Sequence, residues 1–380
     1  MGILLAFNIY TFAIDKIQFS YLAFYLFILS ILILYSLKCF IKFRLQTIIY
    51  LIPIIYLLFS LIYSRNINVG LKFFMFFFVF ILIHIMLTQE DGWHKGFCKT
   101  ILIMSYIFVI ITILAFFFPT TYIKFVFPLF KKESQDIMLR LINVGAQVGM
   151  TNQTAKNGFL ISLGLGILVN KLLTKKESKI IIYSSIMLYI VALFMTLKRS
   201  FIVAHIASIL IIFYLNLKFD NKKINKFIKF IFAAISILVF LLLLEPFIPI
   251  IERTIARFTI VASQDFTSGR LDIYKAGMEL FKERPLIGNG AYSTPTLLGQ
   301  KFGLYGYQQM HNIYLQFLVE FGLLGTCIFM GLIIKAYIVT YKLYKSYFHY
   351  NTEIKFRLGF ALYTQSMWLI YVFFGNPFTE

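Results

Sequence analysis

The sequence predicts an all-α integral membrane protein with about 10–12 transmembrane helices and one large extracytoplasmic loop containing short amphipathic helices. The first observation is composition, because 60% of the 380 residues are hydrophobic and only 14% are charged. That much apolar surface exceeds what one soluble core buries, so lipid must solvate it. The second observation is that basic loops alternate along the chain. We expect residues 1–380 to form a single membrane domain.

The expected spans are apolar runs that end at charged residues or at proline. They cover residues 2–14, 19–37, 47–63, 67–88, 100–118, 157–173, 179–197, 200–216, 227–246, 312–340 and 356–375. The run from Met1 to Ala13 is followed by Asp15 and Lys16 without a small-residue cleavage site, so we expect no cleavable signal peptide.

Every second loop is basic, which is the positive-inside pattern if the N-terminus is cytoplasmic. These loops carry Lys38, Lys42, Arg44, Lys95, Lys99, Lys171, Lys175, Lys176, Lys179, Lys218, Lys222, Lys223, Lys226, Lys229, Lys342, Lys345, Lys355 and Arg357. The net charge of +20 therefore reflects topology, and no nucleic acid is expected as a partner. The same alternation places two long loops outside, a smaller one at 119–156 and a larger one at 247–310.

The larger outer loop departs from the charge rule because it is rich in cations. They are Arg253, Arg257, Arg270, Lys275, Lys282, Arg284 and Lys301. Acidic residues are interleaved with them, so a solvated, ion-paired surface is one interpretation. The other interpretation is a site for an anionic substrate.

Within this loop, the sequence predicts an amphipathic helix from Leu271 to Arg284, capped by Thr267 or Ser268 and ended by Pro285. Its apolar residues at helical spacing are Leu271, Tyr274, Met278 and Phe281. Such a helix is expected on or just above the bilayer. The turn that follows, with Gly288 and Gly290, is expected to expose N–H groups to an anion.

Two further residues combine an outer position with suitable chemistry. Arg199 lies in a short hairpin that the charge alternation places outside, either as a snorkelling cation or as a bidentate ligand for phosphate. His311 is the first residue after the large loop, either as an interfacial anchor or as a general base. The other histidines fall at the cytoplasmic face or, like His205, within a span.

The motifs around His311 resemble the O-antigen ligase and O-antigen (capsular polysaccharide) polymerase superfamily over about residues 140–330. His311-Asn312 is followed by nine residues and then by the Gly-x-x-Gly pattern of Gly322 and Gly325. Gly269-Arg270 and the segment 284–290 match the family's Gly-Arg and Pro-x-x-Gly-x-Gly elements. The family's Ser-Arg pair is reversed here, as Arg199-Ser200, while residues 145–157 are similar to its Asn-rich segment that opens a span.

The resemblance implies a GT-C-type membrane glycosyltransferase of the bacterial cytoplasmic membrane, with its active site on the extracytoplasmic face. Its donor would be an undecaprenyl-diphosphate-linked oligosaccharide, and its other partners membrane lipid and a chain-length regulator and flippase of the same pathway. The implied catalytic residues are His311, Arg270 and Arg199, and the implied substrate-binding residues are Arg284, Asn312, Gly288 and Gly290. We expect neither a cofactor nor a metal, because guanidinium groups would stabilise the diphosphate charge.

Four functions remain open at this point. The leading prediction is a polymerase of O-antigen, capsule or exopolysaccharide that joins lipid-linked repeat units. A ligase that moves finished glycan to another acceptor is the nearest alternative. A non-enzymatic flippase or exporter of lipid-linked sugars would instead place cations along a cavity between spans. A structural scaffold would tolerate the loss of His311.

Overall fold

The computed structural model describes residues 49, 51–71, 73–75, 77–78, 92–174, 179–218, 270–303 and 308–375. These residues form helices and short connections, and no strand occurs among them. The all-α prediction is therefore confirmed. The expected spans at 2–14, 19–37 and 227–246 lie outside the described residues, so the total number of spans stays a prediction.

The described chain contains four helices that are long and apolar enough to cross a membrane. They are α6 (Trp93–Phe117), α9 (Thr154–Thr174), α11 (Arg199–Lys218) and α16 (Ile313–Tyr347). The shorter apolar helices α4 (Leu51–Leu61) and α10 (Lys179–Met195) and the helix α17 (Thr352–Tyr371) pack with them. These elements confirm the predicted membrane protein.

Polar contacts show which helix ends lie together. The His94 ring nitrogen is 3.0 Å from a carboxylate oxygen of Glu353, which joins the start of α6 to the start of α17. At the opposite end of α6, Asn157 near the start of α9 donates to the Thr112 hydroxyl over 2.9 Å. Helices α6 and α17 therefore run in the same direction and α9 in the opposite one, as the charge alternation predicts.

Three spans share a buried polar contact inside the bundle. The ring of His205 on α11 is hydrogen-bonded to the Ser162 hydroxyl of α9 and to the Tyr363 hydroxyl of α17. All three side chains are buried. Because neighbouring protein groups satisfy both ring nitrogens, the imidazole can remain neutral within the apolar bundle. We call Ser162, His205 and Tyr363 the intramembrane trio.

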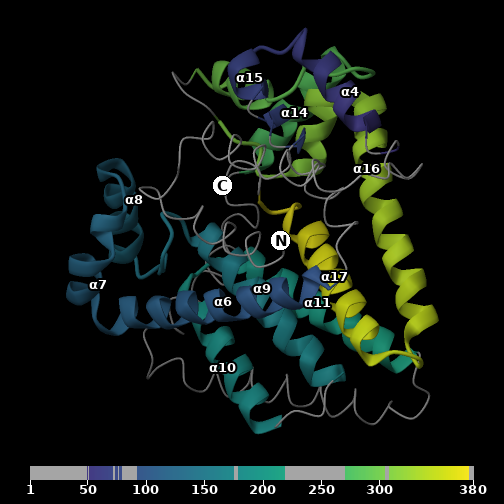
Figure 1. The fold of residues 1–380 in the computed structure, drawn as a ribbon. Coiled ribbons are helices and arrows are strands. Elements are labelled where there is room, and N and C mark those ends of the chain that lie inside the picture. Colours follow the sequence, from purple (N-terminus) through teal and green to yellow (C-terminus); the bar gives the residue numbers. More distant parts are fainter. Residues whose placement is uncertain are drawn as a thin grey trace, which may run out of the picture.

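The segment between α6 and α9 folds into short helices rather than an extended loop. It contains α7 (Pro119–Phe125), a 3-10 turn (Phe127–Leu129) and α8 (Lys132–Asn143). Buried Phe130, Met138 and Val148 form its core, and the Tyr122 hydroxyl donates to the Gly149 carbonyl. The segment is thus a folded cap over the end of α6, seen at the left of Figure 1.

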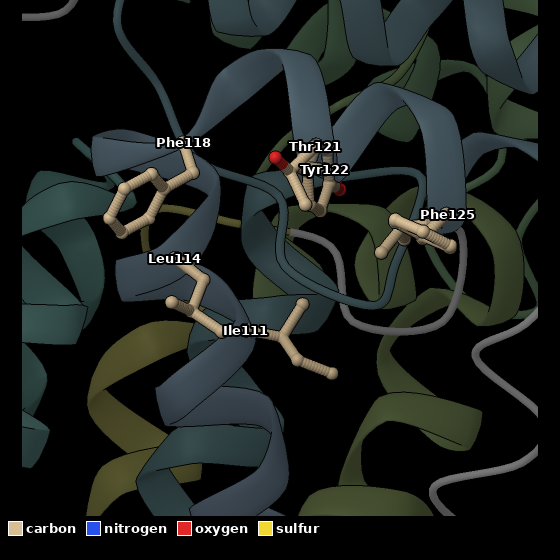
Figure 2. Close-up of a pocket in the computed structure, with 7 residues that line it drawn as sticks. Ile111, Leu114, Phe118, Thr121, Tyr122 and Phe125 are labelled. Carbon is tan, nitrogen blue, oxygen red and sulfur yellow. The ribbon is translucent and has the colours of Figure 1, made fainter.

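An apolar hollow of about 170 Å³ lies where α6 turns into α7. Figure 2 shows Ile111 and Leu114 of α6 below it, with Phe118, Thr121, Tyr122 and Phe125 around it. Its lining contains no charged side chain, so it offers no cation for binding phosphate.

The predicted large loop at 247–310 contains, among its described residues, the helices α14 (Arg270–Glu283) and α15 (Thr294–Lys301), which lie with α4 around the start of α16 (Figure 1). The predicted helix at 271–284 is confirmed. Its buried face, however, is formed by Ala276, Gly277 and Leu280. Leu271 and Met278 from the expected apolar stripe remain exposed, because α16 packs against the neighbouring face.

Candidate functional site

A break in α16 organises the site. Gly322 adopts φ 62° and ψ −167°, a conformation that is essentially restricted to glycine. At the break, backbone N–H and carbonyl groups of α16 no longer bond to each other within the helix. They instead form hydrogen bonds with the backbone of residues 285–290, which we call the ladder. Leu323 N–H donates to the Pro285 carbonyl over 2.8 Å, and Gly290 N–H donates to the Glu320 carbonyl over 2.8 Å. The two glycine motifs of the sequence therefore meet in space.

The ladder explains why both motifs need glycine. Gly288 and Gly322 both have positive φ, 74° and 62° respectively. A Cβ at Gly288 would collide with the backbone of Glu320, and a Cβ at Gly322 would collide with the backbone of Leu286. These residues thus allow two backbones to pack in direct contact.

The same ladder corrects one expectation about the turn at 288–290. Its N–H groups are not available to an anion, because Gly288 donates to the Arg284 carbonyl and Asn289 donates to the Val319 carbonyl. Gly290 is engaged by the ladder as described above. Substrate binding by Gly288 and Gly290 stays a prediction, but it cannot use these N–H groups in the present arrangement.

The first half of the chain supports the ladder through α4 and the turn that follows. The Tyr56 hydroxyl donates to the Phe321 carbonyl over 2.7 Å, and the Tyr63 hydroxyl donates to the Ile287 carbonyl over 2.9 Å. Sequence reasoning missed both tyrosines, because this region carries no signal beyond its hydropathy.

His311 is held at the start of α16 against the end of α17. The next residue, Asn312, caps α16 by accepting the Leu315 N–H over 3.0 Å, and Ile313 N–H donates to the Val372 carbonyl over 3.0 Å. His311 itself is half-buried and has φ 54°, a left-handed conformation that is uncommon for a residue with a side chain. The Asn312 side chain therefore has a local structural role, and its predicted role in substrate binding stays a prediction.

Arg270 reaches the same end of α17. Its guanidinium donates to the Phe374 carbonyl over 2.7 Å, and its charge acts on the Tyr274 side chain one helical turn away. The Tyr274 hydroxyl in turn donates to the His311 carbonyl over 3.5 Å. Burial raises the pKa of Tyr274, and the positive charge of Arg270 offsets part of this increase. The structure thus links Arg270 to His311 through one tyrosine.

We call the meeting of Arg270, Tyr274 and His311 at the end of α17 the junction. The other two predicted arginines lie at different places around it. Arg199 begins α11, and two residues later Phe201 stacks on Tyr371 with ring centroids 4.1 Å apart. The start of α11 therefore meets the same end of α17 as Arg270. Arg284 is exposed beyond the far end of α14.

A buried carboxylate near the break was not predicted. Glu320 is 1% exposed, accepts a hydrogen bond from Gln316 over 2.8 Å, and lies beside the backbone of Tyr292 and Thr294. It therefore lies at the first turn of α15, where a negative charge is favourable. The signal in the sequence was a single acidic residue inside an apolar run, which is uncommon enough in a membrane helix to single out.

The junction gathers a guanidinium, a phenol and an imidazole at one end of the helix bundle. A guanidinium can bind phosphate oxygens in a bidentate manner, and an imidazole can accept a proton. Residues 184–330 match the sequence model of a family described as O-antigen ligase. The family resemblance predicted from the sequence is confirmed.

The matched segment covers less than half of the chain, but it contains every residue of the junction except those of α17. It also contains all the predicted site residues. The match supports a function of the O-antigen ligase or polymerase type, which is enzymatic and glycosyltransferase-like. No curated protein matches the chain.

Proposed function

We propose that this protein polymerises cell-surface polysaccharide by transferring glycan from an undecaprenyl-diphosphate-linked donor to a lipid-linked acceptor repeat unit. The reaction would occur at the extracytoplasmic face of the cytoplasmic membrane. The observation that carries this proposal is the junction of Arg270 and His311 at the end of α17, within a segment that matches the O-antigen ligase family.

The proposed reaction is one displacement at the anomeric carbon of the donor sugar. A hydroxyl oxygen of the acceptor forms the new glycosidic bond while the bond from the anomeric carbon to the diphosphate oxygen breaks. The electron pair leaves with the diphosphate, whose developing charge Arg270 and Arg199 would stabilise. His311 would accept the proton of the acceptor hydroxyl. The membrane confines both lipid tails, which favours the encounter of the two substrates.

A ligase is the second candidate, and the description of the matched family favours it directly. It would use the same leaving group and the same base but would transfer finished glycan to a different acceptor. The products distinguish the two activities. A polymerase yields a ladder of repeat numbers, whereas loss of a ligase leaves the lipid-linked polymer intact but untransferred.

We expect Arg270→Ala and His311→Ala each to abolish polymer and to leave single lipid-linked repeats accumulating. Each variant loses a group that acts on the reacting atoms, so chain length should fall to one repeat rather than shorten gradually. The measurement is gel analysis of extracted glycans at matched protein levels in the membrane.

Lys282→Ala is the matched control, because it removes an exposed cation from the same helix without touching the junction. It should retain the ladder of the parent protein. Normal chain-length distributions in both Arg270→Ala and His311→Ala would exclude the proposed catalytic roles. Intact lipid-linked polymer in both would favour the ligase.

A further inference from the structure

The Tyr274 side chain lies between the two residues on which the proposed chemistry depends. Its hydroxyl donates to the His311 carbonyl oxygen over 3.5 Å, and Arg270 lies one turn before it on α14, close enough for its charge to act on the phenol. We propose that Tyr274 is a positioning residue for glycosyl transfer, an inference that rests on the function proposed above. Its hydroxyl would hold the backbone of His311 and the guanidinium of Arg270 in one fixed relation.

The chemistry of the groups fixes the direction of the hydrogen bond to His311. A carbonyl oxygen can only accept, so the Tyr274 hydroxyl donates its single proton to His311. A guanidinium carries only donors, so Arg270 does not compete for that proton. Because burial raises the pKa of Tyr274, the hydroxyl keeps this proton at neutral pH.

His311 needs such support because of its backbone. Its φ of 54° is unfavourable for a residue with a Cβ, so the surrounding structure must maintain it. On one side, Ile313 is fixed to the Val372 carbonyl. On the other side, Tyr274 contacts the His311 carbonyl itself. The direction in which the imidazole leaves the chain depends on this conformation.

Arg270 is held near the same phenol. One guanidinium nitrogen donates to the Phe374 carbonyl over 2.7 Å, and the charge of the side chain acts on Tyr274. Tyr274 lies one turn after Arg270 on α14, so the helix itself sets the spacing of the two side chains. The Tyr274 hydroxyl thus connects α14 to the backbone of His311, the proposed base. The Arg270 guanidinium connects α14 to the end of α17.

Tyr274→Phe is a suitable variant because it removes only this hydroxyl. The Tyr274 ring packs against a buried cluster that includes Leu280, Met310 and Leu315, and phenylalanine preserves that packing. Tyr314→Phe is the matched control. The Tyr314 hydroxyl donates to the Leu369 carbonyl over 2.7 Å, so the control also loses one partly buried hydroxyl–carbonyl bond close to His311 in sequence.

The experiment compares the parent protein with both variants in proteoliposomes. The probe is the lipid-linked oligosaccharide extracted from cells that lack this chain, and kcat, KM and the unfolding temperature are measured. We expect Tyr274→Phe to lower kcat about tenfold, while KM for the extract changes less than about twofold, because a misplaced base affects the transition state more than ground-state binding. Tyr314→Phe should keep the kcat of the parent protein.

Two outcomes would overturn the inference about Tyr274 alone. One is an active parent protein whose kcat is unchanged by Tyr274→Phe. The other is an equal loss of kcat in both variants that follows a common decrease in unfolding temperature, which would indicate a purely structural role. A parent protein that neither elongates nor transfers the extract would overturn the proposed function, and this inference with it.

Discussion

At the scale of single residues, Gly322 determines whether the break in α16 can form. Its φ of 62° and ψ of −167° lie in a region that other residues essentially avoid. In addition, the Cβ of any other residue would collide with the backbone of Leu286. Glycine is therefore required at position 322 both by the backbone conformation and by the packing. Moving a flexible side chain would relieve neither constraint.

We expect Gly322→Ala to destabilise the protein by about 3 kcal/mol or more, because strain and overpacking act together. Gly331→Ala in the same helix is the control, since a Cβ there meets no atom within 4 Å. That control should be neutral or slightly stabilising, because alanine favours a helix. Thermal unfolding in detergent measures both effects. Equal unfolding temperatures for the two variants would contradict the role assigned to the break.

At the scale of elements, the end of α17 is the common support of the site. It contacts the start of α11 through Tyr371, the start of α16 through Val372, and α14 through Phe374. Deeper in the bundle, the intramembrane trio joins α17 to α11 and α9. The position of Arg199 at the start of α11 therefore depends on how α11 packs against α17.

We expect His205→Ala to lower the unfolding temperature and the rate of glycan transfer, because α11 loses its polar contacts to both neighbours. Each hydrogen bond between membrane helices contributes about 1 kcal/mol, and the deleted ring also leaves a cavity. Ile206→Ala is the control, because this side chain is 56% exposed on the outside of the bundle. The role of the trio would be refuted if both variants unfolded and reacted alike.

The elements differ in how far the sequence predicted them. The helix α14 was predicted nearly to its ends, because a cap, a helical spacing and Pro285 are local signals. The short helix α15 was missed, since it is stabilised by the distant Glu320 as well as by its own residues. Tyr56 is separated from Phe321 by 265 positions, and no periodicity in the sequence reveals such a pairing.

The site shows the same division between local and distant signals. The motifs predicted which residues matter around His311, but they did not predict that Pro285 and Leu323 would pair across the break in α16. Nor did they predict Tyr274 as the connection between Arg270 and His311, because its spacing was equally typical of an apolar helix face. Side-chain chemistry was thus predictable, while the contacts that orient it required the fold.

At the scale of the whole molecule, the ion pairs of Glu353 and the site lie at opposite ends of the bundle. Glu353 at the start of α17 accepts from His94 and is 3.4 Å from Lys95, and the His94 contact lowers the pKa of Glu353. The other end of α17 carries the contacts to Arg270 and to Ile313. If the basic end is cytoplasmic, the site must face the opposite side of the membrane.

Cysteine labelling tests this orientation in a protein whose Cys39, Cys98 and Cys327 are first replaced by serine. Tyr350→Cys introduces a thiol at the basic end, where the side chain is 86% exposed, and Lys282→Cys introduces one on exposed α14. An impermeant maleimide should label Lys282→Cys in intact spheroplasts and Tyr350→Cys only after permeabilisation. The opposite pattern would place the junction of Arg270 and His311 in the cytoplasm, where it would meet no translocated lipid-linked glycan.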